Sequence, residues 1–274
     1  MSRYLTAARL REIESRLTPR DLAVIERVSS LRFVSGAQLA RLHFHGGADP
    51  AADARAARRA LLRLVGLDVL ARLPRAVGGV RAGSAGFVYH LGMAGQRLAL
   101  DRGWQPERRS RRSITPGQLF VAHALAVAEL HTNLTEADRS RRVELLELVG
   151  EPACWRSYGG LPNQRPATLK PDSYARLGIG EYEDSYFFEI DRGTEGSRAI
   201  EGQLIRYLDY HRSGDEQRAR GVFPRTLWLT EDQARADVIA ASVRRLPKGA
   251  RELFAVARFD ELHDLIGGAQ TGAK

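Results

Sequence analysis

Three carboxylates on two neighbouring strand-like segments have the clearest chemical potential in this chain. Asp172 lies in LKPDSYARL, and Glu189 and Asp191 lie in YFFEIDRG, with a short glycine-containing connection between the segments. Side chains alternate along a strand, so Glu189 and Asp191 share one face. If the segments pair as a hairpin, all three carboxylates converge and require a compensating cation or proton. Clustered hard oxygens suit Mg²⁺ or Mn²⁺, as in a metal-dependent phosphodiesterase site.

A fourth carboxylate, Glu129, lies in a helical pattern that is apolar nearly all round, GQLFVAHALAVAELHTNL. Such a helix is expected to be buried on more than one side. A carboxylate within it is costly unless it is paired or bound to a metal. Glu129 is therefore either a further metal ligand or a residue at a polar edge that meets an arginine.

Length and composition bound the class of protein. A chain of 274 residues, 43% of them hydrophobic, favours two domains with proper cores. The single cysteine, Cys154, excludes an internal disulfide and a cysteine-built zinc site. No apolar stretch reaches the roughly 20 residues of a membrane-spanning helix. The N-terminus lacks the apolar region of a secretory signal, so we expect a cytoplasmic protein.

The positive charge is confined to the N-terminal part. Residues 1–116 contain 21 arginines and 9 acidic residues, a net charge of +12, whereas residues 117–274 contain 21 basic and 24 acidic residues, a net charge of −3. This asymmetry favours a basic module that binds a polyanion such as double-stranded DNA, joined to a module with another role.

The basic module has the element order of a winged helix-turn-helix. Helices are predicted over LTPRDLAVIERVSSL, SGAQLARLHF and ADARAARRALLRLV, followed by two short strands around a glycine-rich basic segment. Thr18 caps the first helix, and Ser35 with Gln38 forms a capping box in the second. In this fold the third helix enters the major groove and the wing between the strands touches the DNA backbone. The predicted DNA-binding residues are Gln38, Arg55, Arg58, Arg59, Arg63, Arg72, Arg75 and Arg81.

An alternative for these arginines is a solvated, charged face on a small helical domain. The functional interpretation is favoured because the arginine stripe falls on the helix where a winged helix would place it. The bases that such a helix reads are not indicated, since arginine suits guanine edges and phosphates equally.

The second module is predicted to be mixed α/β. A charged segment, residues 105–114, separates an N-terminal domain (residues 1–104) from a C-terminal one (residues 115–274). The C-terminal pattern reads helix, strand, the Asp172 strand, the Glu189 strand, helix, strand, helix and strand. This order predicts a mixed sheet with helices on its faces.

Two resemblances support this division. Pro171-Asp172, followed by Glu189-Ile190-Asp191 on the next strand, resembles the restriction-endonuclease-like fold of PD-(D/E)xK nucleases. The chain also resembles the replication-relaxation family of bacterial plasmids and integrative elements, in segments including LTPRDLAVIERV, QLARLHF, GFVYHLGMAGQRL, KPDSYARL and YFFEIDRGTE. The family resemblance implies a role in plasmid replication and in DNA relaxation or mobilisation.

The nuclease resemblance implies a metal site. Asp172 and Glu189 would bind Mg²⁺ or Mn²⁺, with Glu129 as the helix carboxylate and Asp191 completing the acidic cluster. However, Asp191 occupies the position at which the motif has a lysine. That lysine normally orients the attacking water and offsets charge in the transition state.

Three further residues match the nuclease pattern. Lys170 lies two residues before Asp172, hence on the same strand face, and is the candidate substitute for the motif lysine. Gln203 and Tyr207 have the QxxxY spacing of the recombination-helicase exonuclease branch of the superfamily. Alternatively, Tyr207 is a packing residue.

Three functions remain open. The first is a metal-dependent DNA endonuclease or nickase, favoured by the retained carboxylates and the QxxxY spacing. The second is a non-catalytic DNA-binding accessory factor with a degenerate nuclease domain, favoured by Asp191 at the lysine position. The third is a regulator that dimerises through its C-terminal domain. The expected partners are double-stranded DNA and either a second copy or other replication and mobilisation proteins.

Overall fold

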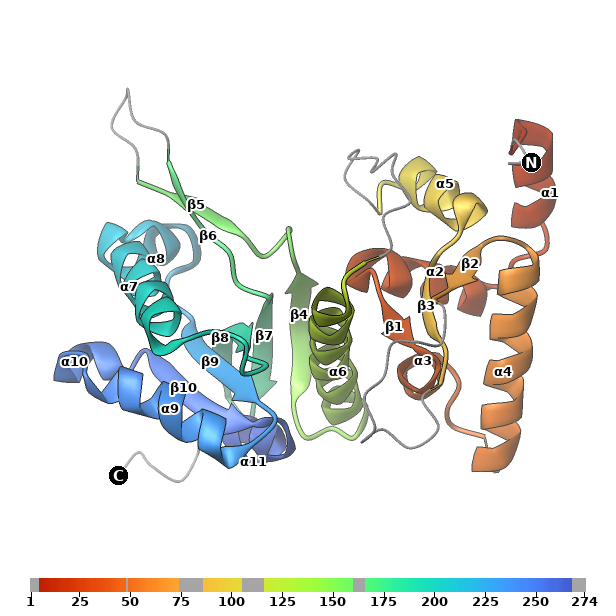
Figure 1. Cartoon of the computed structure of the whole chain (residues 1–274). Coiled ribbons are helices and arrows are strands. Elements are labelled where there is room, and N and C mark those ends of the chain that lie inside the picture. The colour runs from red at the N-terminus through yellow and green to blue at the C-terminus, as the bar shows by residue number, and fades with distance from the viewer. Residues whose placement is uncertain (1–4, 48, 74–85, 105–115, 160–165, 268–274) are drawn as a thin grey trace. The chain divides into compact units, whose positions relative to one another are not determined.

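The computed structural model describes residues 5–47, 49–73, 86–104, 116–159 and 166–267 (Figure 1). The chain divides into two compact units, Met1–Thr132 and Asn133–Lys274. The division falls inside helix α6 (Gln118–Arg139), so this helix, assigned by the sequence to the second module, contributes its first part to the first unit. The linker predicted at residues 105–114 lies outside the described residues.

The first unit combines helices with a small antiparallel sheet. The strand order is β1-β3-β2, with Val34 opposite Tyr89 and Ala71 opposite His90. The predicted succession of helix, short helix, basic helix and two strands is present. In chain order the elements are α1 (Ala7–Glu14), α2 (Pro19–Leu31), β1 (Val34–Ser35), α3 (Gly36–His43), α4 (Pro50–Gly66), β2 (Leu70–Arg72), β3 (Val88–Leu91) and α5 (Met93–Asp101).

The predicted caps of α2 and α3 are confirmed. The Thr18 hydroxyl accepts the Asp21 N–H at 3.2 Å, and an Asp21 carboxylate oxygen accepts the Thr18 N–H at 2.8 Å. Ser35 and Gln38 form the same reciprocal pair at the start of α3. Each box satisfies N–H groups that a helix leaves without intrahelical partners at its N-terminus.

Asp21 also joins α2 to α4. Its side chain is 2% exposed, and both carboxylate oxygens accept bonds from Arg63 Nη2 at 2.6 Å. Burial alone would raise the pKa of Asp21, but the bonds from Arg63 and Thr18 outweigh burial and hold the pKa below its usual value. Arg63 is thus a structural partner of a buried carboxylate.

The second unit is built on a five-stranded mixed sheet of order β10-β9-β8-β7-β4. Strands β4, β7 and β8 are antiparallel, whereas β8, β9 and β10 are parallel. The predicted mixed α/β class is confirmed. The elements are β4 (Glu144–Gly150), β5 (Arg156–Tyr158), β6 (Ala167–Leu169), β7 (Ser173–Ile179), β8 (Tyr182–Ile190), α7 (Ser197–Ser213), α8 (Asp215–Arg220), β9 (Arg225–Thr230), α9 (Gln233–Arg244), α10 (Lys248–Arg251), β10 (Phe254–Arg258), η1 (Phe259–Glu261) and α11 (Leu262–Gly267).

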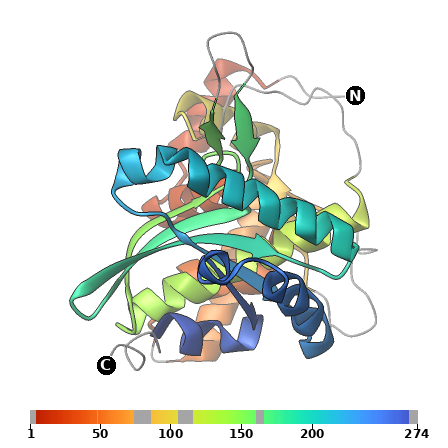
Figure 2. The same cartoon turned by 90° about the vertical axis from the view of Figure 1, so that its left-hand side faces the viewer.

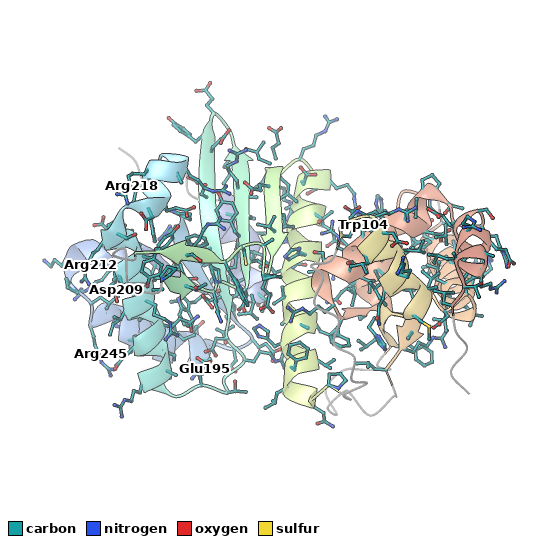
Figure 3. All side chains as sticks on the ribbon, turned by 90° about the horizontal axis from the view of Figure 1, so that it is seen from above. Trp104, Glu195, Asp209, Arg212, Arg218 and Arg245 are labelled. Carbon is teal, nitrogen blue, oxygen red and sulfur yellow. The ribbon has the colours of Figure 1, made fainter. Side chains whose placement is uncertain are left out.

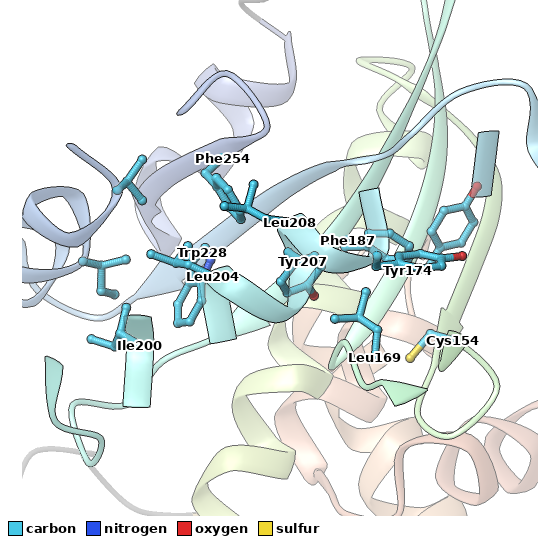
Figure 4. Packing of buried hydrophobic residues seen from close by; sticks show 13 residues of the cluster. Cys154, Leu169, Tyr174, Phe187, Ile200, Leu204, Tyr207, Leu208, Trp228 and Phe254 are labelled. Carbon is cyan, nitrogen blue, oxygen red and sulfur yellow. The ribbon is translucent and has the colours of Figure 1, made fainter. Parts of the chain in front are cut away.

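Helices α7 and α9 cover one face of this sheet (Figure 2). Phe187 of β8 and Trp228 of β9 point to this face and pack against Leu204 and Tyr207 of α7 (Figure 4). Full burial of such large side chains contributes about 1.5–3 kcal/mol each. This cluster therefore fixes α7 over the strand that carries Glu189.

None of the helices in the described part of the chain is both long and apolar enough to cross a membrane.

The contribution of the Asp21–Arg63 ion pair to the stability of α2 and α4 can be tested. Arg63→Ala leaves a buried carboxylate without its cation. We therefore expect the opening free energy of the α2 and α4 amides, as measured by hydrogen exchange, to fall by about 2 kcal/mol. Hydrogen–deuterium exchange of their amides in the full chain measures this loss. Arg59→Ala removes an exposed arginine of the same helix and should change protection by less than about 0.5 kcal/mol. Equal losses in the two variants would contradict a structural role for Arg63.

Candidate functional site

The β7–β8 hairpin brings Asp172 and Glu189 together. Ser173 pairs with Phe188, and the Asp172 N–H donates to the Phe188 carbonyl at 3.0 Å, extending the ladder by one residue. The Ile190 N–H donates to Asp172 Oδ2 at 2.7 Å. The Asp172 carboxylate therefore accepts a hydrogen bond from the backbone of the residue that follows Glu189. The hairpin expected from the sequence is confirmed.

Glu189 is buried among polar groups supplied by α7. Its side chain is on the α7 face of β8, and the residue is 5% exposed. The Tyr207 hydroxyl donates to Glu189 Oε1 at 2.5 Å, and the Gln203 side chain also bonds the carboxyl group. Gln203 and Tyr207 are one helical turn apart and so share a face of α7. The structure thus brings together the QxxxY residues and Glu189.

The surroundings favour the neutral form of Glu189. Burial raises its pKa well above the usual range, and the nearby negative charges of Asp172 and Glu195 raise it further, which the bonds from Tyr207 and Gln203 only partly offset. The strongest charges acting on this carboxyl are therefore carboxylates. Two like charges in one site cannot both ionise freely without a cation.

Tyr207 both packs and donates. It is fully buried, and its ring lies 5.9 Å from that of Phe187 and 6.1 Å from that of Phe254. Burial and the neighbouring Glu189 raise the pKa of the phenol well above its usual value, so the hydroxyl keeps its proton. Tyr207 is thus both a hydrogen-bond partner of Glu189 and a packing residue of the core.

Asp191 does not join the other two carboxylates. It lies directly after β8, where Arg235 of α9 donates to both of its oxygens, at 2.5 Å to Oδ1 and 2.6 Å to Oδ2. Of the three carboxylates expected to converge, Asp191 is thus paired with a guanidinium group, and the described residues show no three-carboxylate group that could hold a metal ion. The pairing of Asp191 with Arg235 was not predicted from the sequence. The two residues lie 44 positions apart, and no sequence motif connects them.

Lys170 is oriented towards an aromatic ring. It is exposed, and its Nζ lies 4.6 Å from the centroid of the Trp155 ring. This geometry is a cation–π contact. The substitution of Lys170 for the motif lysine has no support from this arrangement.

Asp172 and Glu189 could supply two carboxylate groups to a metal ion. Among the described residues, no group of three histidine, cysteine, aspartate or glutamate side chains is arranged to hold one. A Mg²⁺ ion can bind through two carboxylates with waters completing its octahedron. The pair fits such an ion only if Glu189 gives up its proton, and the fit does not extend to Asp191.

Glu129 is an ion-pair residue of the first unit. Its carboxylate accepts bonds from Arg41 Nη1 at 2.5 Å and from Gln38 Nε2 at 2.9 Å. Of the two interpretations of Glu129, the structure agrees with a residue at a polar edge that meets an arginine. It does not place Glu129 as a metal ligand. Gln38 is itself 6% exposed, and its amide also bonds the Ser35 N–H and the Leu125 carbonyl. Its amide is therefore engaged within the protein, and its role in DNA binding stays a prediction.

The arginines of α4 divide into two groups. Arg55, Arg58 and Arg59 are exposed, whereas Arg63 is held by Asp21. Arg55 pairs with Asp49 at 3.1 Å. Within the described residues, Arg58 and Arg59 have no hydrogen-bond or ion-pair partner. Two of the four α4 arginines predicted to bind DNA are therefore free of internal partners among the described residues.

The wing arginines have a different status. The Arg72 guanidinium lies 4.2 Å from the Phe87 ring centroid and 5.8 Å from that of Tyr89, so it stacks on the β2–β3 pair. Arg75 and Arg81 lie outside the described residues.

The burial of Glu189 makes stability depend on pH. The unfolded chain ionises near the usual glutamate pKa, whereas the folded chain holds the proton to higher pH. Stability therefore falls as pH rises between these two values, by at most about 1.4 kcal/mol per unit. Glu189→Gln keeps a neutral group, so its stability relative to the wild type should increase from pH 5 to pH 7.

Urea unfolding with a chelator present measures this difference. Glu252→Gln, at an exposed position, is the control and should show no such trend. A difference between Glu189→Gln and the wild type that is constant with pH would show that Glu189 ionises normally.

Comparison with known proteins places the chain in a family. A family model described as Replication-relaxation matches residues 25–226, most of the chain. This range contains α4, the β7–β8 hairpin and α7, and so both groups of candidate residues. No curated protein and no solved structure gives a significant match. The chain belongs to the replication-relaxation family.

Proposed function

We propose that this protein binds double-stranded DNA in plasmid replication and relaxation, and that α4 makes the central contact. The observation that carries the proposal is the pair Arg58 and Arg59, exposed on one helix and without a protein partner among the described residues. Uncommitted guanidinium groups can bind phosphates or guanine edges without first breaking an internal bridge. Membership of the replication-relaxation family associates the chain with processes that act on DNA.

The arrangement of the first unit supports this role. Helices α2, α3 and α4 are followed by the antiparallel pair β2–β3, which is the element order of a winged helix-turn-helix. In that fold the third helix lies in the major groove. The net charge of +12 over residues 1–116 supplies the attraction to a polyanion that steers the encounter.

Substitutions on α4 test DNA binding. Arg58→Ala and Arg59→Ala should each weaken binding to duplex DNA by about 1 kcal/mol or more and reduce the slope of log K against log salt by about 1. Fluorescence anisotropy at several salt concentrations measures both quantities. Arg97→Ala removes one charge from α5 of the same unit, where Arg97 already pairs with Asp101, and should have a smaller effect.

If Arg97→Ala weakens binding as much as the α4 variants, the attraction depends on net charge alone. If none of the three changes binding, the α4 contact is refuted.

For the second unit we propose a nuclease-like domain that does not cut DNA. The antiparallel β4-β7-β8 portion, continued by parallel β9, resembles the sheet of the restriction-endonuclease-like fold. In the position of the motif lysine, Asp191 is bonded to Arg235, and Lys170 contacts Trp155. Of the two positions considered for the motif lysine, neither therefore offers a free cation to stabilise charge on a phosphoryl group under attack.

Metal-dependent nicking is the second candidate function. It is favoured by the adjacency of Asp172 and Glu189 and by the contacts that Gln203 and Tyr207 make with Glu189. Asp172 and Glu189 would hold a Mg²⁺ or Mn²⁺ ion, which supplies a bound water of lowered pKa when present. Tyr207 and Gln203 would then orient the Glu189 carboxylate.

A plasmid assay separates these candidates. Supercoiled plasmid from the protein's own element should remain intact with Mg²⁺ or Mn²⁺, because Asp191 replaces the motif lysine and Lys170 is directed to Trp155. The matched variant is Asp172→Ala, Glu189→Ala, which should leave DNA binding unchanged. Nicked circles that appear with the wild type and disappear with this variant would establish the second candidate, and Lys170→Ala would then test whether Lys170 replaces the motif lysine.

A further inference from the structure

Arg235 connects three parts of the second unit. Its guanidinium donates to both Asp191 oxygens and, at 2.8 Å, to the Glu195 carbonyl. The side chains of Arg235 and Asp191 are 13% and 3% exposed. Arg235 is itself anchored in the first turn of α9, where its N–H donates to the capping Asp232 at 2.8 Å. Such a paired, charge-assisted geometry is specific to arginine.

The turn that Arg235 holds leads from β8 into α7. The Asp191 N–H donates to the Leu229 carbonyl at 2.9 Å, which ties the start of the turn to β9. Asp191 Oδ1 also accepts the Gly193 N–H at 2.7 Å, and Gly193 adopts the left-handed conformation with φ 74°. The N-cap of α7, Gly196, has no side chain to bond the first turn of the helix. Arg235 therefore supplies bonds at both the beginning and the end of the turn.

Because α7 is a continuous helix, the position of its first turn determines the positions of the turns that follow. Gln203 and Tyr207 follow within this helix and bond Glu189, whose short contact with Tyr207 tolerates little displacement. We propose that Arg235 is a positioning residue of the Glu189 site, acting through Asp191 and Glu195 to set α7 over β8. The inference rests on the proposed grouping of Glu189, Gln203 and Tyr207, whether or not that group binds a metal.

The chain offers a matched control. Arg245, at the end of α9, also reaches α7, where it bonds Glu201 at 2.5 Å. Both of these side chains are exposed, at 65% and 42%. Arg245 is labelled in Figure 3. An exposed pair of this kind contributes little to stability or position. Arg235 thus links α9 to the turn that precedes α7 through a buried bidentate bridge, whereas Arg245 links the end of α9 to α7 itself through a pair at the surface.

The experiment places 3-fluorotyrosine at position 207 of the full chain and records its ¹⁹F NMR resonance under native conditions. In Arg235→Gln the resonance should shift by more than its linewidth or split. In Arg235→Lys, which keeps the charge but not the fork to Asp191 and Glu195, the shift should be smaller. In Arg245→Gln the resonance should be unchanged. Thermal unfolding of each variant is measured in parallel.

A purely structural role would lower the melting temperature of Arg235→Gln and leave the resonance of the folded state in place, which would overturn the proposal. If Arg235→Gln does not fold, the double variant Asp191→Asn, Arg235→Gln removes the buried charge while retaining amide groups, and its resonance must be displaced. The measurement uses neither DNA nor metal, so loss of the proposed DNA binding leaves its outcome unaffected.

Discussion

Glu189 lies on the face of β8 that packs against α7, where only 5% of its surface is exposed. A carboxyl group in this position must be neutral or well bonded. The chain meets the requirement with the hydroxyl of Tyr207 and the amide of Gln203. Asp191, two residues further along, meets the same requirement through Arg235. The arrangement of β8, α7 and α9 therefore depends on two interactions. One is the hydrogen bonding of Glu189 by Tyr207 and Gln203, and the other is the ion pair between Asp191 and Arg235.

The same contrast explains how α4 serves both stability and binding. Arg63 faces inward and neutralises Asp21, whose carboxylate also caps α2. Arg58 and Arg59 face solvent and have no partner among the described residues. A bridge to a buried carboxylate fixes the helix, whereas the exposed arginines remain available to a polyanion. One arginine-rich helix therefore carries both a structural bridge and a candidate DNA contact.

Local patterns in the sequence predicted most of the fold. The N-cap at Thr18, the capping box at Ser35, the β7–β8 hairpin and the helix carrying Gln203 and Tyr207 all follow from spacing within a few residues. The partners of charged residues did not follow. A row of arginines does not reveal which one meets Asp21, and nothing near Asp191 indicates an arginine on α9, four elements later in the chain. Such pairings depend on how distant elements pack, because charge attraction acts between whichever groups the fold brings together.

The most direct test of this account is the titration of the Glu189 carboxyl group itself. Selective ¹³C labelling of glutamate side chains, with Glu189→Gln to assign the resonance, reports its pKa in the full chain without divalent metal. The account predicts a midpoint well above the usual value of about 4.3, and a changed midpoint in Tyr207→Phe because the hydroxyl no longer donates. A midpoint in the usual range in the wild type would contradict the closed, buried environment on which the interpretation of the second unit depends.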